Sequence, residues 1–324
     1  MPVTRLAPSP TGALHLGNAR TFLVNYILAR QNHWKIVLRI DDLDGPRIKP
    51  AMADQAMDDL RWLGIEWDEG PAYQSRRLDM YCRAIDALVA SGEAYPCVCT
   101  RREVDLAASA PHADDGATVY PGTCRGRFAS VAAAHAFAGR PPAIRFRVLP
   151  GQVTFHDHFA GNRSYDVERE LGDFVIAKAD GTPAYQLAVV VDDLEDRVTH
   201  IVRGDDLLDS TPRQMLLYRA LHRLNLTHGH PAPDHFHLPL VLGPDGRRLA
   251  KRHGDTRLSA YREAGATASE ILRLLGGWIG LSPWLKGAVN LGLIIDQFSL
   301  ENLPRSPITF SPVHFNRLPS DVGA

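Results

Sequence analysis

The 324-residue chain contains little cysteine and almost no net charge. Four cysteines are too few for the disulfide framework of a secreted protein of this length. The formal charge of -1 and the pI of about 6.9 exclude a global positive field that would attract nucleic acid to the whole surface. A nucleic-acid partner would therefore have to bind a local basic patch.

The chain also lacks a long uninterrupted apolar segment. Its apolar stretch at residues 271–295 is broken by Arg273, Pro283 and Lys286, so it predicts no membrane span. The first ten residues show no charged segment followed by an apolar one, and we therefore expect a cytoplasmic protein. Hydrophobic residues make up 45% of the chain, which is enough for about two or three compact units.

The first forty residues have the pattern of a strand, a helix and a second strand. Residues 3–6 predict a short strand, and the prolines and glycine up to Gly12 predict a loop. A helix is expected to begin near Gly17 and to bury a stripe formed by Ala19, Phe22, Leu23, Tyr26 and Ile27. The apolar run at residues 36–40 is typical of a strand buried on both faces of a parallel sheet.

A second half of the sheet is expected further along the chain. Strand and helix patterns alternate there at residues 198–202, 211–224 and 236–242. This order predicts a doubly wound α/β fold with a parallel sheet. Ligands of such sheets bind outside the carboxyl ends of the strands, and residues 5–9 and Asp41 would lie at that edge.

The two halves are separated by a segment of different character. Residues 73–183 contain all four cysteines, a polar loop and strand-like runs such as 143–149, which together predict an inserted domain. After residue 254 the pattern becomes helical. The predicted division is a Rossmann-like core over 1–72 and 184–245, the inserted domain over 73–183, and a small module with helices over 246–324.

Two short segments carry most of the functional information. The first consists of His15, Leu16, Gly17 and Asn18. The second lies far downstream, after a turn, and consists of Arg248, Leu249, Ala250, Lys251 and Arg252. In this order, with a strand predicted before each, the pair resembles the HIGH and KMSKS motifs of class I aminoacyl-tRNA synthetases.

This resemblance implies that an amino acid is activated by ATP. The carboxylate of the amino acid attacks the α-phosphorus, pyrophosphate leaves, and the protein supplies positioning and positive potential. His15, Gly17 and Asn18 would bind ATP, because a helix N-terminus offers free N–H groups and a favourable dipole to phosphates. Lys251 would stabilise the phosphates during the reaction, which makes His15 and Lys251 the expected catalytic residues. The usual serine of the family is replaced by Ala250.

Both expected catalytic residues have a plain structural alternative. His15 could serve only to cap the helix, and Lys251 could be a solvated surface residue. The presence of the two motifs in one chain favours the functional interpretation for both.

The surrounding residues narrow the resemblance to glutamyl-tRNA synthetases and their short relatives. They are Arg5, Leu6, Ala7, Pro8, Ser9, Leu38, Arg39, Ile40, Asp41, Asp42, Tyr185, Val202, Arg203 and Gly204. Glutamate has an ammonium group and two carboxylates, so its pocket needs one acid and at least one forked cation. The expected glutamate-binding residues are Arg5, Leu6, Ala7, Pro8, Ser9, Asp41, Tyr185 and Arg203.

Within this set, each charge suits one end of the substrate. Arg5 and Arg203 suit the carboxylates, Asp41 suits the ammonium group, and Tyr185 supplies a hydroxyl. The family usually has Glu at the position of Asp41, so a backbone shift or a bridging water would have to compensate for the shorter side chain. The alternative is an ion-paired strand end formed by Arg39, Asp41, Asp42 and Asp44.

Further segments resemble the short paralogues, the glutamyl-Q tRNA(Asp) synthetases. Members of that family resemble the catalytic core alone and attach glutamate to the queuosine base of aspartate tRNA. The matching segments are residues 120–124, 204–207 and 210–214, whereas residues 10–26 are closer to the long enzymes. Because the chain stops at Ala324, we expect no anticodon-binding domain of the kind found in the long enzymes.

A metal site is predicted in the inserted domain. The zinc-binding pattern of the short family is matched at Cys97, Cys99, Tyr120 and Cys124, which implies one structural Zn²⁺. Thiolates favour zinc, but a C-x-C pair and a phenol are not its usual spacing and ligand. The alternatives are three packed, reduced cysteines, or His112 as the fourth ligand. Cys82 is expected to lie in the core.

Two histidine pairs offer a rival location for a metal. His156 with His158, and His235 with His237, would each share one face of a strand. Packed or solvated histidines are far more common than ligands, and we expect these to be packed or solvated.

Taken as a whole, the resemblance implies an enzyme that makes glutamyl-adenylate from L-glutamate and ATP with Mg²⁺. It would then transfer the glutamate to the queuosine base of aspartate tRNA. We expect a monomer without membrane association. Two alternatives stay open: a truncated glutamyl-tRNA synthetase that charges the tRNA 3′ end, and a non-catalytic paralogue that binds an amino acid or tRNA.

Overall fold

A computed structural model describes residues 1–43, 45–108, 119–227, 229–247, 249, 255–281 and 287–310. Its centre is a seven-stranded sheet with the order β3 (Glu69–Tyr73), β2 (Lys35–Ile40), β1 (Val3–Leu6), β9 (His200–Gly204), β10 (Asp234–Leu238), β6 (Gln152–Asp157) and β7 (Gly161–Asp166). Every pair from β3 to β6 is parallel, and only the edge strand β7 is antiparallel. The predicted α/β fold with a parallel sheet is confirmed.

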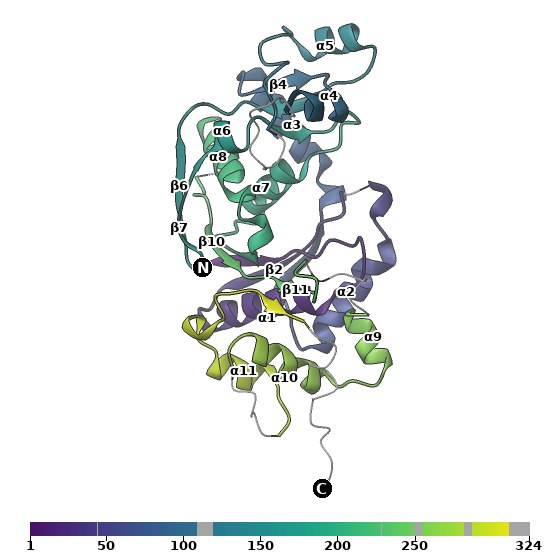
Figure 1. Cartoon of the computed structure of the whole chain (residues 1–324), viewed down its shortest axis with the longest axis vertical. Coiled ribbons are helices and arrows are strands. Elements are labelled where there is room, and N and C mark those ends of the chain that lie inside the picture. The colour runs from purple at the N-terminus through teal and green to yellow at the C-terminus, as the bar shows by residue number, and fades with distance from the viewer. Residues whose placement is uncertain are drawn as a thin grey trace.

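One face of the sheet is covered by α1 (Leu16–Gln31), which connects β1 to β2, and α2 (Pro50–Trp62), which connects β2 to β3. Helix α1 is buried on nearly all sides because α10 (Ala268–Trp278) and α11 (Leu291–Gln297) pack on its outer surface (Figure 1). Arg20 joins the two layers. Its buried side chain donates hydrogen bonds to the carbonyls of Trp278 (3.1 Å) and Pro239 (2.6 Å).

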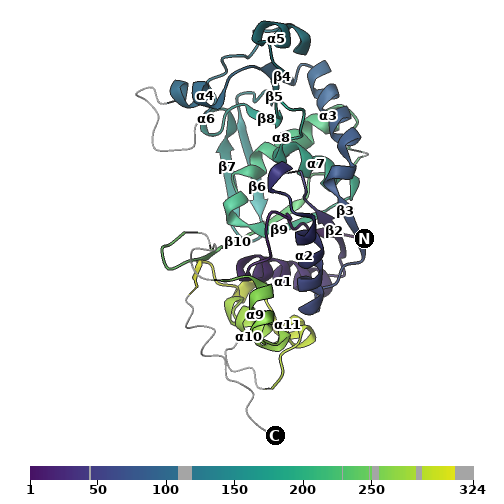
Figure 2. The same cartoon turned by 90° about the vertical axis from the view of Figure 1, so that its right-hand side faces the viewer.

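The other face carries a second hydrophobic core formed by α3 (Leu78–Ala90), α7 (Tyr185–Glu195) and α8 (Ser210–Arg223). A small antiparallel sheet of β4 (Ala94–Cys97), β5 (Ala143–Phe146) and β8 (Phe174–Ala177) packs beside them. Figure 2 shows that this sheet and α5 (Val131–Ala138) lie at one end of the elongated molecule, and α10 and α11 at the other.

The remaining described elements are short. They are the helices α4 (Arg101–Ala108), α6 (Val167–Glu170) and α9 (Leu258–Glu263), the strands β11 (Val241–Leu242) and β12 (Ile308–Thr309), and 3₁₀ turns at Gly45–Arg47, Gln74–Arg76, Asp205–Leu207 and Leu300–Asn302. In the described part of the chain, no helix combines the length and the apolar character needed to cross a membrane.

Two predicted elements differ from the structure. The strand predicted at 236–242 is divided, because Pro239 has no N–H group to continue the ladder. Its second part, β11, pairs with β12 in a separate sheet. The strand predicted at 198–202 begins and ends two residues later, as β9, so Arg203 lies within it.

The segment 73–183 does not form one separate sheet. The hairpin β6–β7 extends the main sheet, and β6 joins it through one parallel pairing of Asp157 with His235. A single pairing between residues that are far apart in the sequence leaves no local pattern to predict it. The division of the chain into domains stays a prediction.

Candidate functional site

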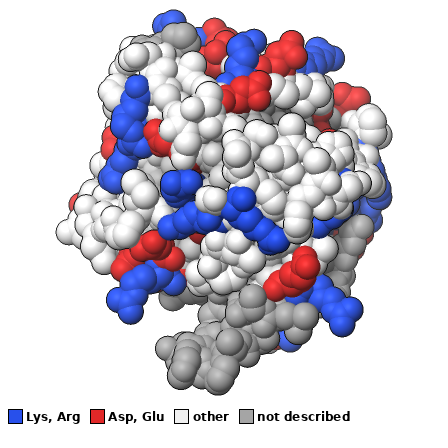
Figure 3. Space-filling model, turned by 90° about the horizontal axis from the view of Figure 1, so that it is seen from above, with Lys and Arg blue, Asp and Glu red and all other residues white. Residues whose placement is uncertain are grey.

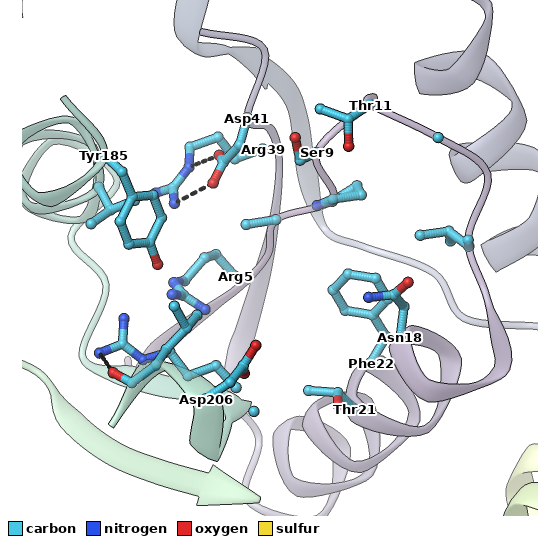
Figure 4. Close-up of a pocket in the computed structure, with 18 of the residues that line it drawn as sticks. Arg5, Ser9, Thr11, Asn18, Thr21, Phe22, Arg39, Asp41, Tyr185 and Asp206 are labelled. Atoms are coloured by element: carbon cyan, nitrogen blue, oxygen red, sulfur yellow. Dashed lines mark hydrogen bonds and ion pairs between the residues drawn. The ribbon is translucent and has the colours of Figure 1, made fainter. Parts of the chain in front are cut away.

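A cavity of about 710 Å³ opens at the carboxyl ends of β1, β2 and β9, beside the N-terminus of α1 (Figure 4). The predicted site residues that line it are Arg5, Ala7, Pro8, Ser9, His15, Gly17, Asn18, Asp41, Tyr185 and Arg203. Leu6 does not line it and packs in the core instead, because successive side chains of a strand point to opposite faces. Lys251 lies outside the described residues.

His15 is the N-cap of α1. Its Nδ1 accepts a hydrogen bond from the backbone N–H of Asn18 (3.3 Å), and Asn18 Oδ1 accepts one from the backbone N–H of His15 (3.3 Å). The neutral ring then carries its proton on Nε2. A Cβ atom at Gly17 would lie 3.0 Å from two ring atoms of His15, so a side chain there would displace the ring. The histidine therefore caps the helix and lines the cavity at once.

The chain on either side of the downstream motif lies close to this helix N-terminus. Except for Leu249, the motif itself is outside the described residues. The N–H group of Leu249 donates to the carbonyl of Val241 (3.1 Å), and Val241 lines the cavity. The N–H group of Leu16 donates to the carbonyl of Thr256 (3.0 Å). The chain thus enters and leaves residues 250–254 beside His15.

Two arginines of the cavity share one buried carboxylate. Arg39 donates to Asp193 Oδ1 through Nη1 (2.7 Å), and Arg5 donates to the same oxygen through Nε (3.3 Å). Since Asp193 belongs to α7, this carboxylate joins α7 to β1 and β2. The neighbouring Asp192 accepts hydrogen bonds from Tyr81 (2.8 Å), Gln74 (2.7 Å) and Arg77 (3.0 Å).

Asp41 is both an ion-pair partner and a cavity residue. Arg39 Nε donates to Asp41 Oδ1 at 2.7 Å, and the Asp41 side chain is 16% exposed. Burial raises the pKa of the Asp41 carboxyl, although Arg39 acts in the opposite direction. A cation bound beside Asp41 would favour its charged form. The ion-paired alternative therefore holds for Arg39 and Asp41, whereas Asp42 accepts hydrogen bonds from the N–H (2.8 Å) and hydroxyl (2.6 Å) of Ser75.

Arg203 has only neutral hydrogen-bond partners among the described residues. They are His237 Nε2 (2.9 Å), Thr211 Oγ1 (2.8 Å) and the carbonyl of Leu207 (3.4 Å). Its Nη1 atom is buried and has no partner in the described part of the chain. Burial lowers the pKa of the Arg203 guanidinium. A buried cation with a spare donor favours a bound anion at this position.

Asp157 supports His237 from the side opposite Arg203. Asp157 Oδ2 lies 2.6 Å from His237 Nδ1, and Oδ1 accepts backbone hydrogen bonds from His237 (3.2 Å), Phe159 (3.0 Å) and Ala160 (2.6 Å). Burial acts to raise the pKa of Asp157, but the hydrogen bonds from His237 and Ala160 outweigh it and lower the pKa to about 2. The carboxylate therefore stays charged.

Several cavity residues were not predicted from the sequence. They are Thr11, Thr21, Phe22, Arg47, Gln74, Lys178 and Asp206. Figure 4 places Phe22 beside Asn18, one helical turn away, so the face of α1 that carries Asn18 could have indicated it. The same figure shows the Tyr185 hydroxyl pointing toward Arg5, on the side of the cavity opposite Phe22 and Asn18. Lys178 follows β8 and carries no local signal.

The three cysteines predicted as ligands form a cluster around Tyr120. The sulfur atoms of Cys97, Cys99 and Cys124 all lie within 4.8 Å of one another. The Tyr120 oxygen is 3.4 Å from the sulfur of Cys97 and 3.5 Å from that of Cys99, and it accepts a hydrogen bond from the N–H of Cys124 (2.9 Å). Arg145 lies over the Tyr120 ring and donates to the Cys97 sulfur (3.3 Å).

The thiols of this cluster differ in acidity. Burial raises the pKa of Cys99 to about 11. Burial also acts to raise the pKa of Cys124, but hydrogen bonds from the Val98 N–H and from Tyr120 outweigh it, so that pKa is lowered. Of these two thiols, Cys124 is therefore the more acidic.

Cys82 and the described histidines lie outside the sulfur cluster. Cys82 is exposed on α3, so the expectation that it lies in the core was wrong: its position falls on the solvent face of an amphipathic helix. Within the described residues, no group of three metal-binding side chains includes a histidine. His235 and His237 are packed, as expected. His112 lies outside the described residues.

Comparison with known proteins relates most of the chain to one family. A model described as tRNA synthetases class I (E and Q), catalytic domain, matches residues 2–301. The chain is 45% identical to a protein of Rhodopirellula baltica named glutamyl-Q tRNA(Asp) synthetase, over 94% of this chain and 95% of that protein. It is also 41% identical to a glutamate–tRNA ligase of Oleidesulfovibrio alaskensis, over 96% of this chain but only 64% of the ligase.

A solved structure has the same arrangement of elements. It is the crystal structure of a glutamate tRNA ligase from Elizabethkingia meningosepticum in complex with its amino acid. The two structures superpose with a TM-score of 0.79 at 30% sequence identity, over 97% of this chain and 68% of the ligase. The similarity therefore includes the main sheet, the segment 73–183 and the C-terminal helices.

The buried histidines predict how stability depends on pH. Burial lowers the pKa of both His235 and His237, so the unfolded chain binds protons near pH 6.5 that the folded protein does not bind. Stability is complete above that pH and falls as the pH decreases, by up to about 1.4 kcal/mol per pH unit for each such histidine. Urea unfolding at pH 5 to 8 measures this slope.

His235→Gln should reduce the slope, because it removes one of these groups. His135→Gln is the matched control, since His135 is exposed. Equal slopes in the wild type and His235→Gln would contradict the assignment.

Proposed function

Because this chain belongs to the class I tRNA synthetases (E and Q), we propose that it activates L-glutamate with ATP and transfers the glutamate to the queuosine base of aspartate tRNA. Family membership fixes the class of reaction, an ATP-dependent ligation.

The observation that carries the proposal is the unneutralised cation of the cavity. Arg203 is buried, has only neutral partners among the described residues, and keeps one donor without a partner. Arg5 lies near it, and Asp41 supplies the opposite charge. A ligand with carboxylates and an ammonium group matches this arrangement. Glutamate has these groups, which supports glutamate as the substrate.

The N-terminus of α1 suits the nucleotide. His15, Gly17 and Asn18 line the cavity where the free N–H groups and the dipole of α1 favour phosphates. Mg²⁺ is expected to arrive with ATP and to neutralise phosphate charge. Leu249 and Thr256, which precede and follow the segment that contains Lys251, lie beside the N-terminus of α1. This position supports a role for Lys251 in stabilising the departing pyrophosphate.

The relatives and the surface charge support the queuosine base of aspartate tRNA as the acceptor. The relative named glutamyl-Q tRNA(Asp) synthetase matches nearly from end to end, whereas the glutamate–tRNA ligase extends well beyond the match. Basic side chains gather across the middle of the face in Figure 3, between acidic ones, which supports a local contact with tRNA. The 41% identity to a glutamate–tRNA ligase favours charging of the tRNA 3′ end as the alternative.

We propose that the protein is a monomer and that it acts in the cytoplasm.

A zinc ion suits the sulfur cluster. Four ligands arranged around zinc at about 2.3 Å lie about 3.8 Å apart, and the sulfurs of Cys99 and Cys124 are 3.5 Å apart. Cys97 and Tyr120 complete a four-membered set, and the cation of Arg145 next to Cys97 offsets thiolate charge. We propose that these four residues hold one structural Zn²⁺, which would fix the fold of the small antiparallel sheet.

Activation is tested by glutamate-dependent exchange of labelled pyrophosphate into ATP without tRNA. The wild type should catalyse exchange, and Lys251→Ala should reduce it on the order of 100-fold or more, because a phosphate-stabilising charge is lost. Lys35→Ala is the matched control, since Lys35 pairs with Glu69 at the amino ends of β2 and β3, away from the cavity at their carboxyl ends. Absence of exchange in the wild type would refute the proposal, and exchange that requires tRNA would favour the 3′-charging alternative.

The acceptor is tested with labelled glutamate and aspartate tRNA that either carries or lacks queuosine. Only the modified tRNA should be labelled, and removal of its 3′-terminal adenosine should leave the labelling unchanged. Labelling that ignores the modification, or that requires the terminal adenosine, would exclude queuosine as the acceptor.

Metal analysis of the purified protein tests the zinc site. The wild type should contain about one zinc per chain, and Cys124→Ser should lose it, because structural zinc needs its full ligand set. Cys82→Ser should keep the metal, since Cys82 is exposed and outside the cluster. Tyr120→Phe tests the phenol as a ligand. Equal zinc contents in Cys124→Ser and Cys82→Ser would contradict the site.

A further inference from the structure

Three buried side chains form a hydrogen-bonded series behind the cavity. Asp157 in β6 contacts His237 in β10, and His237 contacts Arg203 in β9. Asp157 and His237 have no exposed side-chain surface, and Arg203 is 5% exposed. The series begins in the hairpin that extends the main sheet and ends at the cavity wall.

Simple chemistry fixes the direction of these hydrogen bonds. A guanidinium group can only donate, so His237 Nε2 must accept from Arg203 Nε. The Nε2 atom is then unprotonated, and the proton of the neutral ring must be on Nδ1. That proton points to Asp157 Oδ2, whose carboxylate can only accept while it is charged. Asp157 therefore selects the tautomer that Arg203 requires.

The same contacts set the orientation of Arg203. Nε is held by His237, and Nη2 is held by Thr211 and the carbonyl of Leu207. A planar guanidinium that is fixed at two nitrogens cannot rotate. Its third nitrogen, Nη1, is buried and has no partner among the described residues, and Arg203 lines the cavity.

We propose that His237 is a positioning residue for the amino-acid substrate, and that Asp157 acts through it by selecting the Nδ1–H tautomer. This inference rests on the proposed function, because Arg203 is taken to bind a carboxylate of glutamate. Neither residue lines the cavity: both act by fixing the guanidinium of Arg203, which does line it.

Asp157→Asn tests the tautomer. Asparagine can keep its oxygen on the backbone N–H groups of Phe159 and Ala160, and its amide N–H₂ then faces His237 Nδ1. His237 Nδ1 must then accept a hydrogen bond, so the ring proton moves to Nε2. There it faces the Nε–H group of Arg203, and the hydrogen bond between the two side chains is lost. The KM for glutamate in pyrophosphate exchange should rise on the order of 10- to 100-fold, while the KM for ATP changes by less than about twofold.

Two substitutions of His237 form a matched pair. His237→Gln can place its amide oxygen near the position of Nε2 and still accept from Arg203. His237→Asn is shorter, so it can reach Asp157 but not Arg203. The KM for glutamate should therefore rise less in His237→Gln than in His237→Asn. An equal rise in both, or an equal rise in the KM values for ATP and glutamate, would show a merely structural role and overturn the proposal.

Nitrogen NMR of histidine-labelled protein reads the tautomer without any assay of activity. The signal lost in His237→Asn should be that of an Nδ1–H tautomer in the wild type, and the corresponding signal should become Nε2–H in Asp157→Asn. A protonated or Nε2–H His237 in the wild type would refute this inference alone. A wild type that has the Nδ1–H tautomer but no glutamate-dependent exchange would refute the proposed function and leave only the tautomer assignment standing, so the two failures are distinguishable.

Discussion

The burial of three guanidinium groups at one edge of the parallel sheet is the constraint on which the site depends. Arg5, Arg39 and Arg203 are 6%, 0% and 5% exposed. Removing such ions from water costs several kcal/mol each unless they are paired. Helix α7 brings Asp193 to Arg5 and Arg39, and Asp41 pairs with Arg39, so two carboxylates balance these two cations. Arg203 receives only neutral acceptors among the described residues. The charges of Arg5 and Arg39 are thus compensated within the protein, whereas the charge of Arg203 is left for a ligand.

This electrostatic arrangement joins the cavity to distant parts of the chain. Asp192, next to Asp193, is held by Tyr81, Gln74 and Arg77, which lie at the beginning of the segment 73–183. From there α3 leads to β4, whose last residue is Cys97 of the sulfur cluster. The cluster is therefore joined to the floor of the cavity through one helix and one strand. A metal in it would act on the shape of the small sheet.

The sequence predicted the parts of the site that lie within single local patterns. The strand, loop and helix at residues 3–31 carry Arg5, His15 and Asn18, and strand ends carry Asp41 and Arg203, so their meeting at one sheet edge follows from the fold class. It could not predict contacts that depend on pairing between residues far apart in the sequence. The histidines of β10 are packed, which agrees with the expectation of packed or solvated side chains, yet nothing local indicates that the partners of His237 are Arg203 and Asp157. The same lack of a local signal explains why the hairpin β6–β7 was assigned to the inserted domain.

The choice of a histidine beside Arg203 has a physical reason. A carboxylate at position 237 would orient the guanidinium equally well, but it would also neutralise it and weaken the attraction for an anionic ligand. An ammonium group would repel it. A neutral imidazole accepts one hydrogen bond without adding charge, and the charge that fixes its tautomer, on Asp157, is held one side chain further away by three backbone N–H groups. The arrangement orients the cation while leaving its charge available to the cavity.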